Sequence, residues 1–587
     1  MVNSYLAHMK FLLVLSISLA CLTSYAQVKP GSDKVLYNNT ELFTLGKVWG
    51  FMKYYQPAVS QGKLDWDQIL LSTLNDPAKK GVSKTVEIWM ALAQNTNYDA
   101  VAIKGFAFDS VDVRNFNLNW INKNTLLTTN QKKALHEMVS RPAVGNYWSA
   151  TGERLYYSSS TEKTYTGKST AYRILNLFRA WNIIEYFYPY KYQLDNNWDQ
   201  VLKTNITAFV NANTDLSYKK ALTLFSATIN DSHTSLEPTY NYDVLGAFTS
   251  PFKFQLAGDD VVVTKIVNAA ACDAAGIGVG DVITLINGQT VPQIINRLKA
   301  FIPASNESVT RREAYSYLFS GAEEAVTASG RKLNGQQLNT TFKRVKRVFY
   351  DEWDKDGLPD YKLFYKGKTY PLSYYDEQQK RAVYDFTTDK IAYIDFALLE
   401  PKRIDSIMKL YMDQKGIVFD LRGYNDDGNL MKIFDYLSPE PMYFGIKSQP
   451  LFNMPGKFAF RDHIINDELK YIGKKNPNYF KGKVVVLINE HTQSAEELWA
   501  MVFKKVPNVT LIGSQTAGAD GAKTPIKLID GSKIIFSGLG IYYPDGKETQ
   551  RVGIVPDVVV KQTVESLQQS RDLLTESAFK LIAGGAN

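Results

Sequence analysis

The sequence predicts a multidomain α/β protein with a duplicated helical module in its N-terminal half. Its 587 residues exceed what one ordinary hydrophobic core organises, so several domains are expected. Motifs of the first 150 residues recur further along the chain. From residue 391 onward, short apolar runs alternate with helical stretches, which is the pattern of an α/β domain with a largely parallel sheet. Hydrophobic and charged contents of 45% and 21% are typical of globular proteins.

The repeat relates residues 27–150 to residues 165–245 at an offset of 132. The apolar spacing in both copies suits amphipathic helices, and we expect their tryptophans to fill two small cores. The second copy continues into His233, and the first copy has no histidine at the matching position. The recurring residues are Trp49, Tyr54, Pro57 and Trp66-Asp67-Gln68, matched by Trp181, Tyr186, Pro189 and Trp198-Asp199-Gln200.

Residues 1–26 predict a signal peptide and therefore an exported protein, periplasmic or secreted. Lys10 precedes a ten-residue apolar run that is too short to span a membrane, and Ser24-Tyr25-Ala26 supplies the small residues of a cleavage site after Ala26. Lipid attachment at Cys21 is the alternative. No later segment has the length and apolar character of a membrane span.

Cleavage leaves Cys272 as the single cysteine, which excludes an intramolecular disulfide. Neither a metal nor a cofactor is expected, because the chain has five histidines and no Cys/His cluster with zinc-site spacing. The net charge of +8 includes no basic block, so nucleic acid is not an expected partner.

Ser494 is the first candidate for chemistry. It follows the apolar run 484–488, which predicts a buried strand, and precedes 498–503, which predicts a helix. A serine at such a turn projects its hydroxyl from a tight backbone bend, and the first helical N–H groups point at the group that the hydroxyl attacks. Glu497, three residues later, also makes a capping-box pattern, so a helix cap and a nucleophile are both open.

The segment Thr492-Gln493-Ser494-Ala495-Glu496-Glu497 is similar to the T-x-S-A-x-E signature of the carboxyl-terminal processing and tricorn-core serine peptidases. The resemblance implies a crotonase-like α/β catalytic core over residues 381–575. Three further segments are similar to motifs of that family and occur in the same order: Asn230-Asp231-Ser232-His233-Thr234, Asp420-Leu421-Arg422-Gly423 and Gly553-Ile554-Val555-Pro556-Asp557.

Residues 246–345 resemble a PDZ domain through the stretch 275–288. Gly280-Asp281 predicts a turn, 282–286 a strand and Asn287-Gly288 a tight turn. Such β-rich domains accept an extended peptide at a sheet edge, and the alternative is a domain that only packs against the core. Residues 346–380 are expected to form an exposed connector or hairpin.

Relatives activate the serine with a lysine or with a histidine. In the lysine branch the base lies in a T-x-G-K-G motif, where this chain has Ala519 in the lysine position, and Lys523 is a displaced substitute. The resemblance to the tricorn-like branch therefore favours His233 as the base, with Ser232 before it expected to help orient the ring. His491, on the approach to the nucleophile, is a rival.

The tricorn-like branch places a glutamate shortly before its closing motif, and the matching position here is Gln550. Glutamine can orient a ring but supplies no charge to stabilise an imidazolium. Glu548, two residues away, is the alternative third member.

The oxyanion of a tetrahedral intermediate needs hydrogen-bond donors. One is the N–H of Ala495, and the second is expected from Gly423 or Tyr424. Asp420 and Arg422 are expected to brace that loop.

Together these features predict an exported serine endopeptidase that acts on a peptide or unfolded protein. A non-catalytic peptide- or ligand-binding protein on the same scaffold is the alternative, and hydrolysis of a small ester is a third. Ser494 and His233 favour the enzyme, whereas Gln550 favours the binding protein.

Overall fold

The computed structural model describes residues 35–78, 80–99, 110–140, 148–151, 154–157, 169–347, 362–371, 374–376, 381–383, 385–425, 430–462 and 470–584. The predicted signal peptide over 1–26, with Cys21, lies outside these ranges, as do residues 348–361 of the predicted connector. Within the described ranges, no helix is long and apolar enough to cross a membrane.

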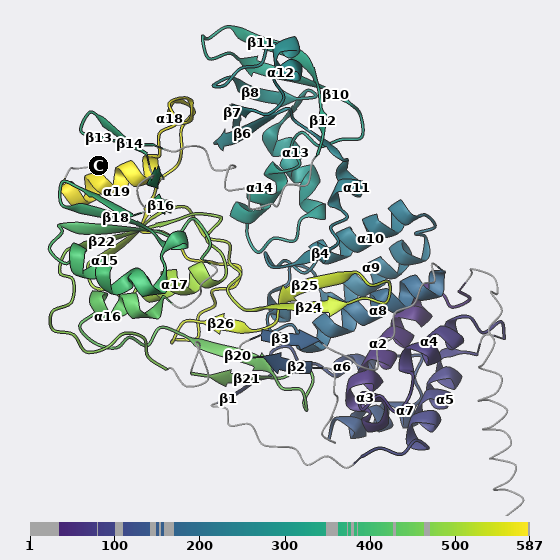
Figure 1. The fold of residues 1–587 in the computed structure, drawn as a ribbon. Coiled ribbons are helices and arrows are strands. Elements are labelled where there is room, and N and C mark those ends of the chain that lie inside the picture. Colours follow the sequence, from purple (N-terminus) through teal and green to yellow (C-terminus); the bar gives the residue numbers. More distant parts are fainter. Residues whose placement is uncertain are drawn as a thin grey trace, which may run out of the picture.

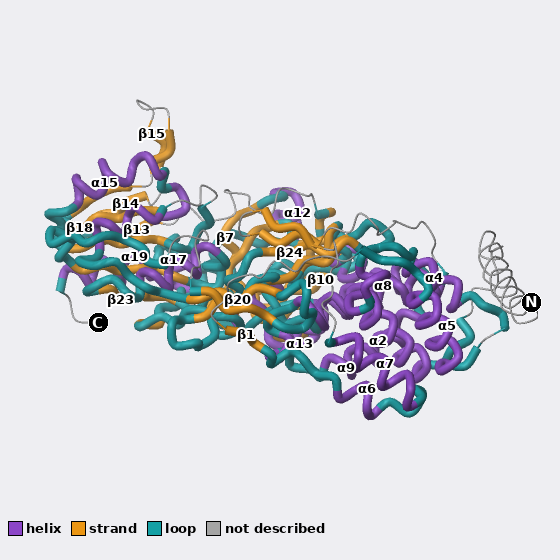
Figure 2. Tube along the Cα trace, turned by 90° about the horizontal axis from the view of Figure 1, so that it is seen from below, coloured by secondary structure: helices purple, strands orange, loops and turns teal. Residues whose placement is uncertain are grey.

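The N-terminal half is a helical region at one end of the molecule (Figures 1 and 2). Asn38 begins the first helix with a reciprocal capping box, in which the side chains of Asn38 and Glu41 each accept from the other's amide. The first copy comprises α2 (Asn39–Tyr55), α3 (Pro57–Ser60), α4 (Trp66–Leu74), α5 (Val82–Gln94), α6 (Asn119–Lys123) and α7 (Thr129–Val139), and the second comprises α8 (Thr170–Phe187), α9 (Trp198–Val210), α10 (Asp215–Ala227) and α11 (Asn241–Leu245).

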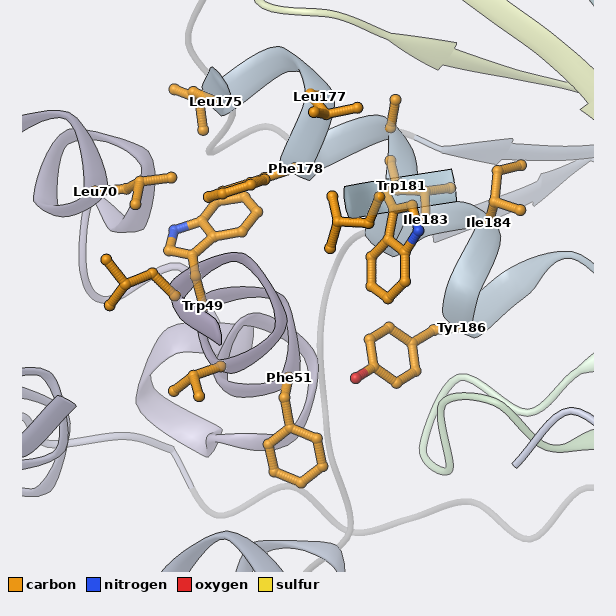
Figure 3. Close-up of a cluster of buried hydrophobic side chains, with 14 of the residues drawn as sticks. Trp49, Phe51, Leu70, Leu175, Leu177, Phe178, Trp181, Ile183, Ile184 and Tyr186 are labelled. Atoms are coloured by element: carbon orange, nitrogen blue, oxygen red, sulfur yellow. The ribbon is translucent and has the colours of Figure 1, made fainter. Parts of the chain in front are cut away.

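The two copies share one core, so the expectation of two small cores is wrong. Figure 3 shows Trp49 of α2 in the same apolar cluster as Phe178 and Trp181 of α8. Glycines allow this close approach, because a Cβ at Gly46 would lie 2.6 Å from the Phe178 ring and one at Gly50 would lie 1.9 Å from Asn182. Each of these contacts joins positions that match in the repeat, as a two-fold relation between the copies requires.

Residues 246–345 form a separate β-rich module, the teal part at the top of Figure 1. Its antiparallel sheet has the order β11-β10-β8-β7-β6, with β9 paired to β8. The turn between β8 and β9 uses Asn287 and Gly288 at φ +49° and +72°, as the sequence predicted. The strands are β6 (Phe252–Ala257), β7 (Asp260–Ile266), β8 (Val282–Ile286), β9 (Gln289–Thr290), β10 (Ala325–Arg331) and β11 (Gln337–Lys343), and the helices are α12 (Ala269–Ala275), α13 (Val291–Leu298) and α14 (Glu307–Tyr315).

The C-terminal part is an α/β domain, and the predicted multidomain α/β class is confirmed. Its sheet has the order β17-β18-β19-β22-β23-β27, parallel from β18 to β27 and antiparallel at β17. Apolar layers cover both faces. The strands are β17 (Asp385–Thr388), β18 (Ile391–Asp395), β19 (Gly416–Asp420), β22 (Lys483–Ile488), β23 (Val509–Gly513) and β27 (Val558–Val559), and the helices are α15 (Ile404–Tyr411), α16 (Phe434–Leu437), α17 (Ala495–Phe503), α18 (Val564–Gln568) and α19 (Leu573–Ala583).

Residues 362–371, which the sequence assigned to a connector, form the hairpin of β13 (Lys362–Tyr365) and β14 (Lys368–Pro371). Leu363 and Tyr365 are buried in one apolar cluster with Phe579 of α19. This hairpin is therefore part of the α/β domain. Other short pairs are β2 (Trp148–Thr151) with β3 (Arg154–Tyr157), β5 (Phe248–Thr249) with β12 (Val345–Lys346), and β15 (Tyr374–Asp376) with β16 (Arg381–Val383).

Two further sheets join the helical region to the α/β domain. The strand β1 (Ser110–Asp112) pairs with β21 (Phe458–Arg461), and β4 (Ser235–Glu237) pairs with β25 (Lys533–Ser537). Each sheet thus takes one strand from outside the α/β domain, and β4 begins two residues after His233. The sheets are completed by β20 (Ile446–Pro450) and β26 (Gly540–Tyr542) in one, and by β24 (Lys523–Lys527) in the other.

Candidate active site

Ser494 lies between the carboxyl end of β22 and the first residue of α17, at the predicted strand-to-helix turn. Its backbone has φ +63° and ψ −120°, an uncommon and strained conformation for a residue with a side chain. An ordinary N-cap has a negative φ in the extended region. The Ser494 N–H donates to the carbonyl of Ala519 at 3.0 Å, which holds this turn, and the residue is half-buried.

Glu497 ties the turn to the loop after β23. Its fully buried carboxylate accepts from Gly518 N–H at 2.7 Å, Ala519 N–H at 2.9 Å and the Thr516 hydroxyl, and more distantly from Ser494 N–H at 3.4 Å. Burial raises the pKa of Glu497 above its usual value, and the donated hydrogen bonds oppose that shift. The acidic residue of the capping-box pattern therefore shapes the backbone around Ser494.

His233 lies in the loop between α10 and β4 and is 2% exposed. Its Nδ1 is 2.9 Å from Ser537 Oγ, while Nε2 is buried with no hydrogen-bond partner among the described residues. Burial lowers the pKa of His233 well below its usual value, and the positive charges of Lys523 and Arg312 lower it further. The ring is therefore neutral at neutral pH, as a general base requires.

The nucleophile turn and the base loop are joined directly. Gln493 Nε2 donates to the Ser232 carbonyl at 3.2 Å, and the bonded residues immediately precede Ser494 and His233. A second connection runs through Ala517, whose N–H donates to Thr492 O at 3.0 Å and whose carbonyl accepts from Ser232 Oγ at 2.9 Å. Segments 261 positions apart in the sequence are thus in direct contact.

Asp231, which lies in the quoted motif, is fully buried and is surrounded by donors. Its carboxylate accepts from His233 N–H at 3.0 Å, Ser537 N–H at 2.6 Å, Ser537 Oγ at 3.0 Å and Gln550 Nε2 at 3.1 Å. Burial raises the pKa of Asp231, and these hydrogen bonds oppose the shift.

Two predicted site residues contact groups other than the histidine ring. The Gln550 amide donates to Asp231, and the Ser232 hydroxyl donates to Ala517 O and accepts from Ser305 N–H at 3.0 Å. Sequence analysis missed Ser537, and no motif marks it; only the pairing of β4 with β25 brings it to the ring.

Ala495 and Gly423 lie after the carboxyl ends of two neighbouring parallel strands, β22 and β19. Ala495 is the first residue of α17, and Gly423 follows β19. The Gly423 loop is anchored on both sides, since Thr492 Oγ1 donates to Leu421 O at 2.9 Å and Asn425 N–H donates to Glu496 Oε1 at 2.8 Å. A Cβ at Gly423 would lie 2.7 Å from the Ala397 Cβ, which explains the glycine.

Asp420 and Arg422 brace the base of that loop. Arg422 binds Asp420 through Nε at 2.9 Å and Nη2 at 2.6 Å, and its Nη2 also reaches Asp572 at the start of α19 at 2.7 Å. The Tyr393 hydroxyl donates to the same Asp420 at 2.7 Å.

The three rival residues have other hydrogen-bond partners or are exposed. His491 is exposed, and its N–H donates to Asn489 Oδ1. Glu548 is half-buried and accepts from Arg114 at 3.1 Å and from the Tyr192 hydroxyl at 3.0 Å. Lys523 is exposed on β24. The described part of the chain gives none of them a hydrogen bond to Ser494 or His233.

The β-rich module contacts both halves of the site. Arg312 of α14 donates to Glu490 O at 2.6 Å and to Gln493 Oε1 at 3.0 Å, on the nucleophile side. Ser305 holds the base loop through its reciprocal bonds with Ser232. Asn306 Nδ2 donates to Thr516 O at 2.8 Å, beside the Glu497 loop.

Comparison with known proteins identifies the α/β domain. Residues 390–560 match the family described as Peptidase family S41. This match over the α/β domain confirms the resemblance to a serine peptidase family that the motifs suggested. The S41 match contains Ser494 and Gln550, whereas His233 lies outside it.

Curated relatives match over limited lengths. The carboxy-terminal-processing protease of Bartonella bacilliformis is 29% identical over 116 residues, which cover 20% of this chain and 27% of that protein. A probable CtpA-like serine protease of Staphylococcus aureus is 24% identical over 327 residues, covering 55% and 54%. The chain thus spans about half or less of the length of these relatives.

A solved structure supports the fold. Mature CPAF complexed with lactacystin aligns with a TM-score of 0.54 at 12% identity, covering 71% of this chain and 99% of that chain. At this identity the likeness concerns the fold alone.

Proposed function

We propose that this S41 protein is an exported serine endopeptidase in which Ser494 is the nucleophile and His233 the general base. One observation carries the proposal: the strand-to-helix turn that holds Ser494 at φ +63° is hydrogen-bonded, through Gln493 and Ser232, to the loop of a buried histidine whose Nε2 has no partner among the described residues. Signal-like residues 1–26 support export.

In the first step Ser494 Oγ attacks the peptide carbonyl carbon while His233 Nε2 takes the hydroxyl proton. Charge develops on the carbonyl oxygen, where the N–H groups of Ala495 and Gly423 serve as donors. His233 then gives the proton to the leaving amine. Water, deprotonated by the same ring, hydrolyses the acyl-enzyme and restores Ser494.

The proposed substrates are peptides or unfolded proteins. Two relatives are named carboxy-terminal processing proteases, and these names support carboxyl-terminal segments as the proposed substrates. The α/β domain is proposed to be crotonase-like and the 246–345 module PDZ-like, with edge strand β6 able to accept a peptide strand. The site needs no cofactor for these steps.

The test is labelling by a fluorophosphonate probe together with cleavage of a peptide. Ser494→Ala is expected to abolish labelling and to lower cleavage by roughly 10³-fold or more. His233→Ala should lose most of both, whereas His491→Ala, at the exposed histidine, should behave as wild type. Normal cleavage by folded Ser494→Ala protein would overturn the assignment.

The non-catalytic binding protein remains the second candidate, favoured by the uncharged Gln550. It predicts no probe labelling of the wild-type protein and unaltered peptide binding in Ser494→Ala.

A further inference from the structure

The contact between the His233 ring and the nearest buried carboxylate runs through a serine hydroxyl. Ser537 Oγ lies 2.9 Å from His233 Nδ1 and 3.0 Å from Asp231 Oδ1. We propose that Ser537 and Asp231 are positioning residues that complete the site as the series Ser494, His233, Ser537 and Asp231. This inference rests on the proposed function and assigns roles that the sequence motifs did not predict.

Counting protons fixes the direction of each hydrogen bond. A hydroxyl has one proton, and an ionised carboxylate can only accept. Asp231 faces two backbone N–H groups and an amide NH₂, none of which can accept, so the ionised form suits its surroundings. Ser537 therefore donates to Asp231, and its oxygen is left to accept from His233 Nδ1–H.

The consequence is a single tautomer. With the proton on Nδ1, the lone pair of His233 lies on Nε2, the buried nitrogen with no partner among the described residues. That nitrogen is the one a base needs to take the Ser494 proton. The Nδ1 proton stays on the ring throughout, and Asp231 stays ionised.

The protonated ring of His233 needs stabilisation because its surroundings disfavour a positive charge. Burial and the positive charges of Lys523 and Arg312 all disfavour a charged His233. The Ser537 hydroxyl dipole, aligned by Asp231, offsets this when the ring takes the serine proton.

Gln550 supports the same arrangement. Its Nε2 lies 3.1 Å from Asp231 Oδ1 and is also within 3.4 Å of Ser305 Oγ. A glutamate here would bring a second carboxylate against Asp231 in a fully buried position, and like charges this close cannot both ionise easily. A neutral donor at 550 is what a carboxylate at 231 requires.

The first experiment compares Ser537→Ala and Asp231→Asn with Ser60→Ala. Ser60 is a matched control, a buried serine of α3 whose hydroxyl donates to Pro57 O at 3.2 Å, far from the site. We expect kcat to fall roughly 10- to 10³-fold in the two site variants with KM little changed, a smaller loss than the about 10⁴-fold of a carboxylate in direct contact with histidine. Their acidic limb should move to lower pH, because the imidazolium has lost stabilisation. Unchanged kcat and pH profile in both variants would overturn the proposal.

The second experiment is Gln550→Glu, which separates the two candidate carboxylate positions. If Asp231 supplies the charge, the extra carboxyl disturbs it and kcat falls at least severalfold. If position 550 is the proper site of the acid, the same change raises kcat. A raised kcat would therefore refute the role of Asp231.

The third measurement does not depend on hydrolysis. ¹⁵N-histidine NMR of the Ser494→Ala protein reports which ring nitrogen carries the proton. We expect His233 to be the Nδ1–H tautomer, and Ser537→Ala to alter its Nδ1 resonance while Ser60→Ala does not. An Nε2–H ring would refute the series, whereas an Nδ1–H ring in a wild-type protein without hydrolase activity would refute the proposed function alone.

Discussion

The duplicated helices offer a stability experiment with an internal control. Asp67 and Asp199 occupy matching positions of the repeat, and each pairs with a cation of the opposite copy. Asp67 binds Arg179, and Asp199 binds Lys47, which is itself the position matching Arg179. The proposed experiment compares Asp67→Asn with Asp199→Asn, which make the same change at matching positions of the two copies.

The two variants should differ in their loss of stability because Asp67 is buried and Asp199 is partly exposed. The Asp67 side chain is 6% exposed and contacts Lys53 and Arg179, which are 2% and 1% exposed. Removing one partner of a buried ion pair costs about 3–5 kcal/mol. The Asp199 side chain is 37% exposed, and solvent screens its pair, so about 1 kcal/mol or less is expected. The difference between the variants should be about 3 kcal/mol.

The pH dependence has a definite sign. Burial alone would raise the pKa of Asp67, but the charges and hydrogen bonds of Lys53 and Arg179 lower it below its usual value. A carboxyl whose folded-state pKa is lowered adds stability above its unfolded-state pKa, about 3.9, and that stability is lost as the pH falls through the folded-state value. The gap between wild type and Asp67→Asn should therefore narrow below about pH 4.

Urea unfolding followed by tryptophan fluorescence measures the effect, because most of the nine tryptophans precede residue 200 and report on the helical core. Equal losses in the two variants, or an Asp67→Asn loss below that of Asp199→Asn, would refute the reasoning from burial.

The remaining predictions concern the site. Arg312→Ala removes charged hydrogen bonds to Glu490 and Gln493, each worth about 1.5–3 kcal/mol, so labelling of Ser494 by a small probe should fall about tenfold or more. Arg311→Ala on the same helix, which contacts Gly258 O and Asp259, is the control. Unchanged labelling with impaired peptide cleavage would instead mean that the module only selects substrates. The lowered pKa of His233 keeps the base neutral in mild acid, so the acidic limb of kcat/KM should lie below pH 6.5, and a limb above pH 7 would contradict the burial of the ring.

The elements of the α/β domain could be predicted because their signals are local. The run 484–488 is apolar over its whole length and forms the buried strand β22, and the helix expected at 498–503 is contained in α17. The shared helical core could not be predicted in the same way. It depends on Gly46 and Gly50 of one copy meeting Phe178 and Asn182 of the other, a tertiary contact that neither segment reveals alone.

The candidate site also combines residues that local motifs predict with residues that only tertiary contacts bring together. Ser494 and His233 were proposed because each lies in a motif, and the structure joins their segments through Gln493 and Ser232. The interpretation of Gln550 as a ring-orienting group came from counting positions, whereas the structure directs its amide to Asp231. No sequence signal distinguishes Ser537 from other strand serines, because its contact with the ring depends on a pairing between strands about 300 positions apart.

The placement of the proposed base gives the helical region a part in the proposed reaction. His233 lies outside the matched S41 residues, in the loop between α10 and β4. This loop is held against the Ser494 turn because β4 pairs with β25 and Ser232 binds residues 493 and 517. A general base must lie within hydrogen-bond reach of the proton it takes, so small shifts of α8–α10 relative to the α/β domain act directly on the rate. The reciprocal contacts between the two copies restrain those helices. The first copy, which has no matching histidine, therefore contributes to the proposed reaction by holding the second copy in place.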